Sequence, residues 1–218
     1  MALYQKGILG DFWNKVGTVV GRKWYRGKFA MASYAKRVSN PNTEAQQIQR
    51  ARFAAAGEMA TAMLAGLNIG LLGRRKRRVS TAIGEFVKLN LPAITAADPE
   101  MVSVDYAGIV VATGHGTPVK FNAPDFTNPQ QVGATFEPLD EYPFADDNDD
   151  VYVLVYCPDA KQSVLSMPTN RSVGRVMVEV PSFWTGMKVH LWGWTVGGGI
   201  DNKGRISDSA YIGTGTVA

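Results

Sequence analysis

The stretch Arg175-Val176-Met177-Val178-Glu179-Val180-Pro181 places a valine at every second position. After a turn around Thr185-Gly186, the chain continues as Val189-His190-Leu191-Trp192-Gly193-Trp194-Thr195-Val196. A period of two, with β-branched and aromatic residues between turn residues, is typical of strands that bury one face in a core. The two stretches therefore predict two neighbouring β-strands.

Similar short runs extend the β pattern on both sides. They are bounded by Gly, Pro, Asn and Asp, and they lie at 102–106, 109–111, 151–156 and 206–213. Regular spacing of this kind indicates an antiparallel sandwich or a barrel. The last runs resemble the closing strands of an immunoglobulin-like or fibronectin-like sandwich. Cys157 is the only cysteine, so an internal disulfide is impossible, and its apolar surroundings predict a buried thiol.

The residues before this region predict a β-hairpin and two helices. Gly27 stands where a tight turn needs a positive φ, and Thr43 with Gln46 has the spacing of a capping box. The first helix is expected from Ala45 to about Leu67, and Ser80 is expected to cap a second helix that ends before Pro92. We therefore expect an α+β protein with a basic hairpin-helical region over 1–95 and an acidic β-sandwich domain over 96–218.

The charges are divided unevenly along the chain. Residues 1–90 hold 16 Lys and Arg against 4 Asp and Glu, a net +12, whereas residues 91–218 hold 7 against 15, a net −8. The sum is the overall +4. An asymmetry of this size indicates that one half meets a polyanion, or that opposite halves of neighbouring copies attract each other.

The candidate polyanion-binding residues form two groups. They are Arg22, Lys23, Arg26 and Lys28 in the hairpin, and Arg74, Arg75, Lys76, Arg77 and Arg78 between the helices. Five consecutive cations repel one another, so the second group is expected in an exposed loop. Lys and Arg clusters bind phosphates without sequence preference. Trp24, Tyr25 and Phe29 could stack on unpaired bases, or they could be core residues of the hairpin.

Stretches near both ends of the chain resemble known sequences. The pattern Asn40-Pro41-Asn42-Thr43-Glu44-Ala45-Gln46, followed by Gln49-Arg50-Ala51-Arg52-Phe53, resembles both an uncharacterised family of Bacteroidota proteins and small phage or prophage structural-region proteins. The endings Val178 to Gly186 and Ser207 to Gly213 resemble the same Bacteroidota family. The resemblance implies a virion-associated or assembly role and supplies no catalytic residues. The Arg74 to Arg78 run is not part of it.

Few residues suggest catalysis or a cofactor. His115 lies between two glycines without a partnered Ser, Cys or carboxylate motif, and His190 lies in an alternating strand. The segment Asp146-Asp147-Asn148-Asp149-Asp150 could gather Ca²⁺. It lacks an EF-hand glycine and distal glutamate, so a solvated loop or an acidic contact for a basic neighbour is the alternative. We expect no catalytic residues, no cofactor and no metal.

These observations predict a non-enzymatic phage-type virion or assembly structural protein. Its basic half would anchor to nucleic acid or an acidic protein surface, and its sandwich would pack against other virion proteins or other copies of the chain. The alternatives are a free nucleic-acid-binding protein and, last, an enzyme that uses His115. The start of the chain is too polar for a signal peptide, and no apolar run reaches the ~18 residues of a membrane span. The expected location is therefore the virion or the host cytoplasm, without membrane contact.

Overall fold

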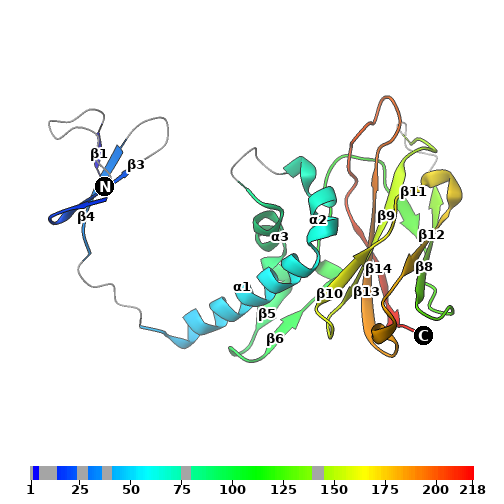
Figure 1. Ribbon diagram of the computed structural model, residues 1–218, viewed down its shortest axis with the longest axis horizontal. Coiled ribbons are helices and arrows are strands. Elements are labelled where there is room, and N and C mark those ends of the chain that lie inside the picture. Colours follow the sequence, from blue (N-terminus) through cyan, green and yellow to red (C-terminus); the bar gives the residue numbers. More distant parts are fainter. Residues whose placement is uncertain (1, 5–13, 24–28, 36–40, 75–79, 139–144) are drawn as a thin grey trace. The chain divides into compact units, whose positions relative to one another are not determined.

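The protein is described by a computed structural model that covers residues 2–4, 14–23, 29–35, 41–74, 80–138 and 145–218 (Figure 1). Their contacts divide the chain into two compact units, Met1–Asn42 and Thr43–Ala218. The expected boundary at 95/96 therefore does not coincide with the division in the structure, because the helices pack with the sandwich. The mixed α+β class is confirmed. Within the described residues, no helix combines the length and apolarity needed to cross a membrane.

The first unit contains a four-stranded antiparallel sheet instead of a lone hairpin. Its strands are β1 (Ala2–Tyr4), β2 (Asn14–Val16), β3 (Val19–Lys23) and β4 (Phe29–Ser33), in the order β1-β4-β3-β2. Gly17, with a φ of 59°, forms the turn between β2 and β3, a conformation that glycine adopts without steric cost. The turn expected at Gly27 lies outside the described residues.

Three α-helices begin the second unit in the described part of the chain: α1 (Glu44–Ala62), α2 (Leu64–Gly70) and α3 (Ala82–Asn90). The expected first helix is interrupted at Met63, so it forms α1 and α2. The capping box is wrong, because the Thr43 side chain makes no capping hydrogen bond. The cap of α3 is Thr81 and not Ser80, since the Thr81 hydroxyl accepts a hydrogen bond from the Gly84 N–H at 3.1 Å.

Short elements connect the helices to the sandwich. The 3₁₀ turns are η2 (Leu72–Arg74), η3 (Leu91–Ala93) and η4 (Tyr106–Gly108), and a small antiparallel pair is formed by β5 (Ile94–Ala96) and β6 (Val102–Val104). Arg52 fixes α1 to this segment. Its guanidinium donates to the carbonyls of Ile94 at 2.7 Å and Leu91 at 2.8 Å, which ties three elements together through backbone acceptors.

Two antiparallel sheets follow. One has the order β12-β8-β7 and the other β10-β9-β13-β14, with β11 also pairing with β9. The strands are β7 (Val119–Phe121), β8 (Gln131–Pro138), β9 (Asp150–Cys157), β10 (Gln162–Leu165), β11 (Thr169–Asn170), β12 (Arg175–Glu179), β13 (Lys188–Val196) and β14 (Ala210–Thr216). Figure 1 shows the helices on one side of the β9–β13 sheet. The second unit therefore has three layers.

Strand β9 is buried on both faces because two hydrophobic cores lie against it. Val151, Val153 and Val155 point into the core between the two sheets, whereas Leu154 and Tyr156 point into the core beneath the helices. Burial on both faces explains why this strand has a continuous apolar run instead of an alternating one. Cys157 is fully buried in the inter-sheet core, as predicted.

Candidate functional site

The two predicted basic groups lie in different units. Arg22 and Lys23 are exposed on β3 of the first unit, whereas Arg26 and Lys28 lie outside the described residues. Arg74 ends η2 in the second unit. Arg75, Lys76, Arg77 and Arg78 also lie outside the described residues, so the structure does not bring the two groups into one described site.

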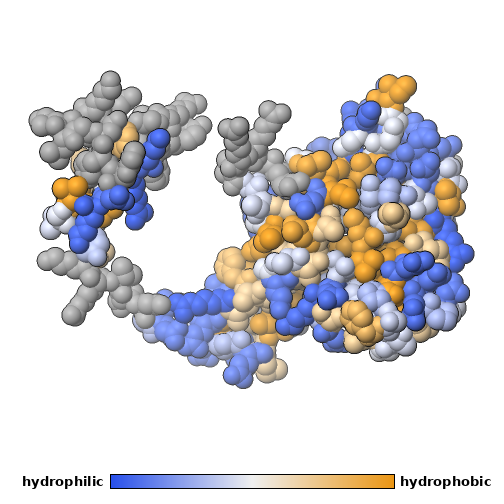
Figure 2. Space-filling view, viewed as in Figure 1, coloured by the Kyte–Doolittle hydropathy of each residue, from blue (hydrophilic) through white to orange (hydrophobic). Residues whose placement is uncertain are grey.

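The division into units also separates a positive part of the chain from a slightly negative one. Residues 1–42 hold 8 Lys and Arg against Asp11 alone, a net +7, so residues 43–218 hold 15 against 18, a net −3. The first unit therefore carries a net positive charge, and three of its cations, Lys15, Arg22 and Lys23, lie on described strands of its sheet. In Figure 2, hydrophilic residues lie beside apolar ones on the described part of this unit.

The N-terminal sheet contains an aromatic residue that sequence reasoning missed. The Lys15 Nζ lies 3.8 Å from the centroid of the Tyr34 ring, a cation–π contact. Tyr34 is 43% exposed, whereas Phe29 is 6% exposed. Of the two interpretations of Phe29, the core interpretation is therefore correct. Trp24 and Tyr25 lie outside the described residues.

A second candidate region is the glycine-flanked loop at His115, in the second unit. Its N–H groups are held by the neighbouring segment, because Gly114 donates to Asp208 Oδ1 at 3.1 Å and Gly116 donates to the Ile206 carbonyl at 2.7 Å. A Cβ on Gly114 would lie 2.2 Å from that carbonyl oxygen, so only glycine fits there. His115 is consequently presented to solvent on a closely packed loop.

This loop borders a cavity of about 870 Å³. The cavity is lined by Gly73, Thr113, Gly114, His115, Gly204, Arg205, Ile206 and Asp208. The polar groups on its walls include the His115 imidazole, the Arg205 guanidinium and the Asp208 carboxylate. The Asp208 carboxylate already accepts the hydrogen bond from Gly114. No serine or cysteine is among these lining residues, and Thr113 supplies the one hydroxyl side chain among them, for which no hydrogen bond to His115 is seen in the described structure.

His190 is part of the folded core. Its Nδ1 lies 2.9 Å from the Tyr211 hydroxyl, and its ring stacks on Tyr106 with centroids 3.7 Å apart. Burial, with a smaller contribution from Lys188, lowers the pKa of His190 to about 4. The imidazole is therefore neutral near pH 7 and acts as a packed aromatic group.

The acidic segment has a different role from those expected, because Asp149 is buried. Its carboxylate lies 3.2 Å from the Arg171 guanidinium, and both side chains are at most 2% exposed. Asp149 also accepts hydrogen bonds from Asn202 Nδ2 at 2.7 Å and the Gly198 N–H at 3.1 Å. A solvated loop or a contact for Arg74–Arg78 therefore does not describe this residue.

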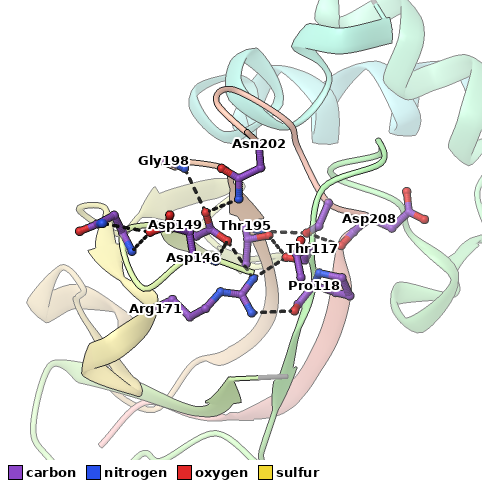
Figure 3. A network of polar contacts seen from close by, with 11 residues as sticks. Thr117, Pro118, Asp146, Asp149, Arg171, Thr195, Gly198, Asn202 and Asp208 are labelled. Atoms are coloured by element: carbon purple, nitrogen blue, oxygen red, sulfur yellow. Dashed lines mark hydrogen bonds and ion pairs between the residues drawn. The ribbon is translucent and has the colours of Figure 1, made fainter. Parts of the chain in front are cut away.

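Arg171 extends the network to a further loop, as Figure 3 shows. It donates to the carbonyls of Thr117 at 2.7 Å and Pro118 at 3.2 Å. Asp146 accepts hydrogen bonds from the N–H and the side-chain amide of Asn148, at 2.8 and 2.9 Å. Within the described residues, no group of three His, Cys, Asp or Glu side chains is arranged to hold a metal ion.

Comparisons with known proteins identify a family for this chain. Residues 11–213 match a family of unknown function, DUF6266. No curated protein matches the chain. A solved structure with some likeness is the fibronectin type III domain of the human collagen alpha-1(XX) chain, at 13% identity and a TM-score of 0.31, which covers 49% of this chain and 89% of the domain.

Proposed function

Because the chain belongs to DUF6266, a family of unknown function, we propose a function from its own residues: it is a non-enzymatic structural protein of a virion or a comparable assembly. The basic N-terminal unit is the anchor, and it binds an anionic partner. The sandwich unit packs against neighbouring proteins, including other copies of this chain. The assignment to a phage or prophage assembly, and to Bacteroidota, depends on the motif around Asn40 to Phe53.

The observation that carries the proposal is the excess of cations in the first compact unit. The chain divides at Asn42/Thr43, and the same division separates +7 from −3. A small unit with this excess of cations attracts polyanions through long-range electrostatics. A large mixed unit with a slight negative charge is suited to protein contacts. The cations at Arg74–Arg78 would add to the attraction from the second unit.

We further propose that the sandwich is immunoglobulin-like, in its fibronectin-like form. Support comes from its two antiparallel sheets of three and five strands around one core, without a disulfide. Strands β10 and β12 are edges of different sheets and border a groove of about 390 Å³. Met167 on this groove is 83% exposed, which offers a surface for packing between proteins.

The non-enzymatic assignment is supported by the roles of the candidate groups. His190 is buried and neutral, and Asp149 is committed to Arg171. His115 is exposed, and no hydrogen bond joins it to a serine, threonine or cysteine side chain among the described residues. Support for a protein that binds and packs is therefore stronger than support for one that catalyses.

Salt elution from heparin tests the anchor. Arg22→Gln/Lys23→Gln should elute at lower salt than the wild type, because fewer cations contact the polyanion and release fewer counterions on binding. The matched control is Lys88→Gln/Lys188→Gln, which removes two exposed cations from the second unit. The proposal requires the control to elute near the wild type, and equal shifts for both variants would contradict it.

Sedimentation velocity and electron microscopy test the assembly role. The full chain should form oligomers or co-purify with a larger particle. A monomer at high concentration, with no associated particle, would count against the structural role. If that monomer still binds DNA or RNA in a salt-dependent way, the free nucleic-acid-binding protein becomes the better assignment.

A further inference from the structure

The register of the N-terminal sheet places two cations on one face. Lys15 pairs with Val20, and Val20 pairs with Ala32 on the next strand. Arg22 follows Val20 by two residues, so its side chain points to the same side of the sheet as Lys15. Diagonal neighbours of this kind have side chains about 7–8 Å apart. Both residues are exposed, and Lys23 points to the opposite face.

Tyr34 completes this face. It follows Ala32 by two residues, and its contact with the Lys15 ammonium places its ring on the side of Lys15 and Arg22. Its backbone is fixed to the β2–β3 turn, because the Tyr34 N–H donates to the Thr18 carbonyl at 2.7 Å. The ring is held from one side by a cation and remains 43% exposed.

A shallow cavity adjoins the ring. It measures about 390 Å³ and is lined by Thr18, Val19, Met31, Ala32, Ser33 and Tyr34. Val19, Met31 and Ser33 alternate with Val20 and Ala32, so their side chains point to the face opposite Lys15 and Arg22, and the cavity lies at the edge of the Tyr34 face and not within it. A flat base could stack on the exposed part of the Tyr34 ring, while phosphates of the same strand contact the two cations.

We propose that the face formed by Lys15, Arg22 and Tyr34 binds single-stranded nucleic acid, with a base against the Tyr34 ring and phosphates on Lys15 and Arg22. The inference rests on the proposed function and names the partner of its basic unit. Sequence-tolerant recognition of single strands combines a basic surface with an aromatic ring on which bases stack. An acidic protein surface would use the two cations but would gain nothing from stacking on an exposed ring.

The test compares two polyanions, one with bases and one without. Fluorescence anisotropy measures binding of the full chain to a labelled oligothymidylate of about 16 nucleotides, and competition with this probe measures heparin binding. Tyr34→Ala should weaken oligothymidylate binding by roughly five- to a hundred-fold, the range of one lost stacked base. Heparin binding should change by less than about two-fold, because the net charge is unaltered.

Two further variants keep the test decisive if Tyr34→Ala disturbs the sheet. Tyr34→Phe retains the ring and should bind oligothymidylate like the wild type. Phe183→Ala removes a ring that is 56% exposed in the second unit and should have no effect. Lys15→Gln should weaken binding of both polyanions, because both depend on charge.

The outcomes separate the inference from the proposed function. If heparin binds but oligothymidylate does not, or if Tyr34→Ala weakens binding of both equally, the nucleic-acid inference is overturned. The basic anchor of the proposed function then stands. If Tyr34→Phe binds as weakly as Tyr34→Ala, stacking is refuted. If neither polyanion binds, the proposed function fails as well.

Discussion

Arg171 and Asp149 form a buried ion pair that joins loops far apart in the chain. Removing one partner of such a pair leaves an uncompensated charge away from water, which is costly even when the intact pair contributes little net stability. Because Arg171 also holds the carbonyls of Thr117 and Pro118, the loss would loosen the loops of one end of the sandwich together.

We predict that Asp149→Asn lowers the free energy of unfolding by about 3–5 kcal/mol. Urea denaturation followed by tryptophan fluorescence measures it. Glu137→Gln is the matched control, since it breaks an exposed pair with Lys120 and should cost less than about 1 kcal/mol. A double variant Asp149→Leu/Arg171→Met should be more stable than Asp149→Asn. Similar small losses for Asp149→Asn and Glu137→Gln would show that the pair is not critical.

The burial of Asp149 and its pairing with Arg171 could not be predicted from the sequence. Asp149 lies in a run of acidic residues that predicts solvent exposure, and its partner is 22 positions away, outside any periodic pattern. Lys15 and Tyr34 are likewise distant in sequence and meet only through the register of β2, β3 and β4. Contacts of this kind depend on tertiary structure, so neither residue composition nor spacing could identify them.

At the scale of elements, η4 packs on the sheet of β13 and β14 through aromatic rings. His190 lies between Tyr106 of η4 and Tyr211 of β14. Burial also raises the pKa of both tyrosines, so all three rings favour the neutral form. The contact between these elements therefore depends on His190 remaining uncharged.

We predict that this contact makes stability depend on pH. The pKa of His190 is about 4 in the folded protein and about 6.5 in an unfolded chain. Between these values the unfolded state binds more protons, so stability falls as the pH falls from about 6.5 to 4, by up to about 3 kcal/mol. Urea unfolding at several pH values measures the effect, with His190→Gln as the reference. Parallel pH profiles for both proteins would refute the assignment.

Elements with a clear pattern were predictable. The alternation of β12 and the helix signal after Thr43 correspond to observed elements. The expected strand at 109–111 is wrong: Val111 is buried, but the segment runs without a partner strand among the described residues. A run of β-branched residues can be buried by side-chain packing without forming a strand. Backbone pairing needs a neighbour, which the sequence does not reveal.

At the scale of the whole molecule, the boundary between the basic and acidic parts of the sequence differs from the boundary between the compact units. The sequence asymmetry suggested a boundary near 95, because the basic residues extend to Arg78. The contacts place the boundary at Asn42/Thr43, because Met59, Met63 and Leu67 share a core with Leu154 and Trp194. Hydrophobic burial therefore defines the units, while charge defines what each unit can attract.

The central claim is that the N-terminal unit binds the polyanion. The most direct test compares heparin binding of the full chain with that of Thr43–Ala218, a fragment that keeps both hydrophobic cores of the second unit. At about 0.15 M salt, we predict that the fragment binds at least about ten-fold more weakly and has a shallower salt dependence, because most cationic contacts are lost. Equal affinity and equal salt dependence of the two proteins would contradict the claim.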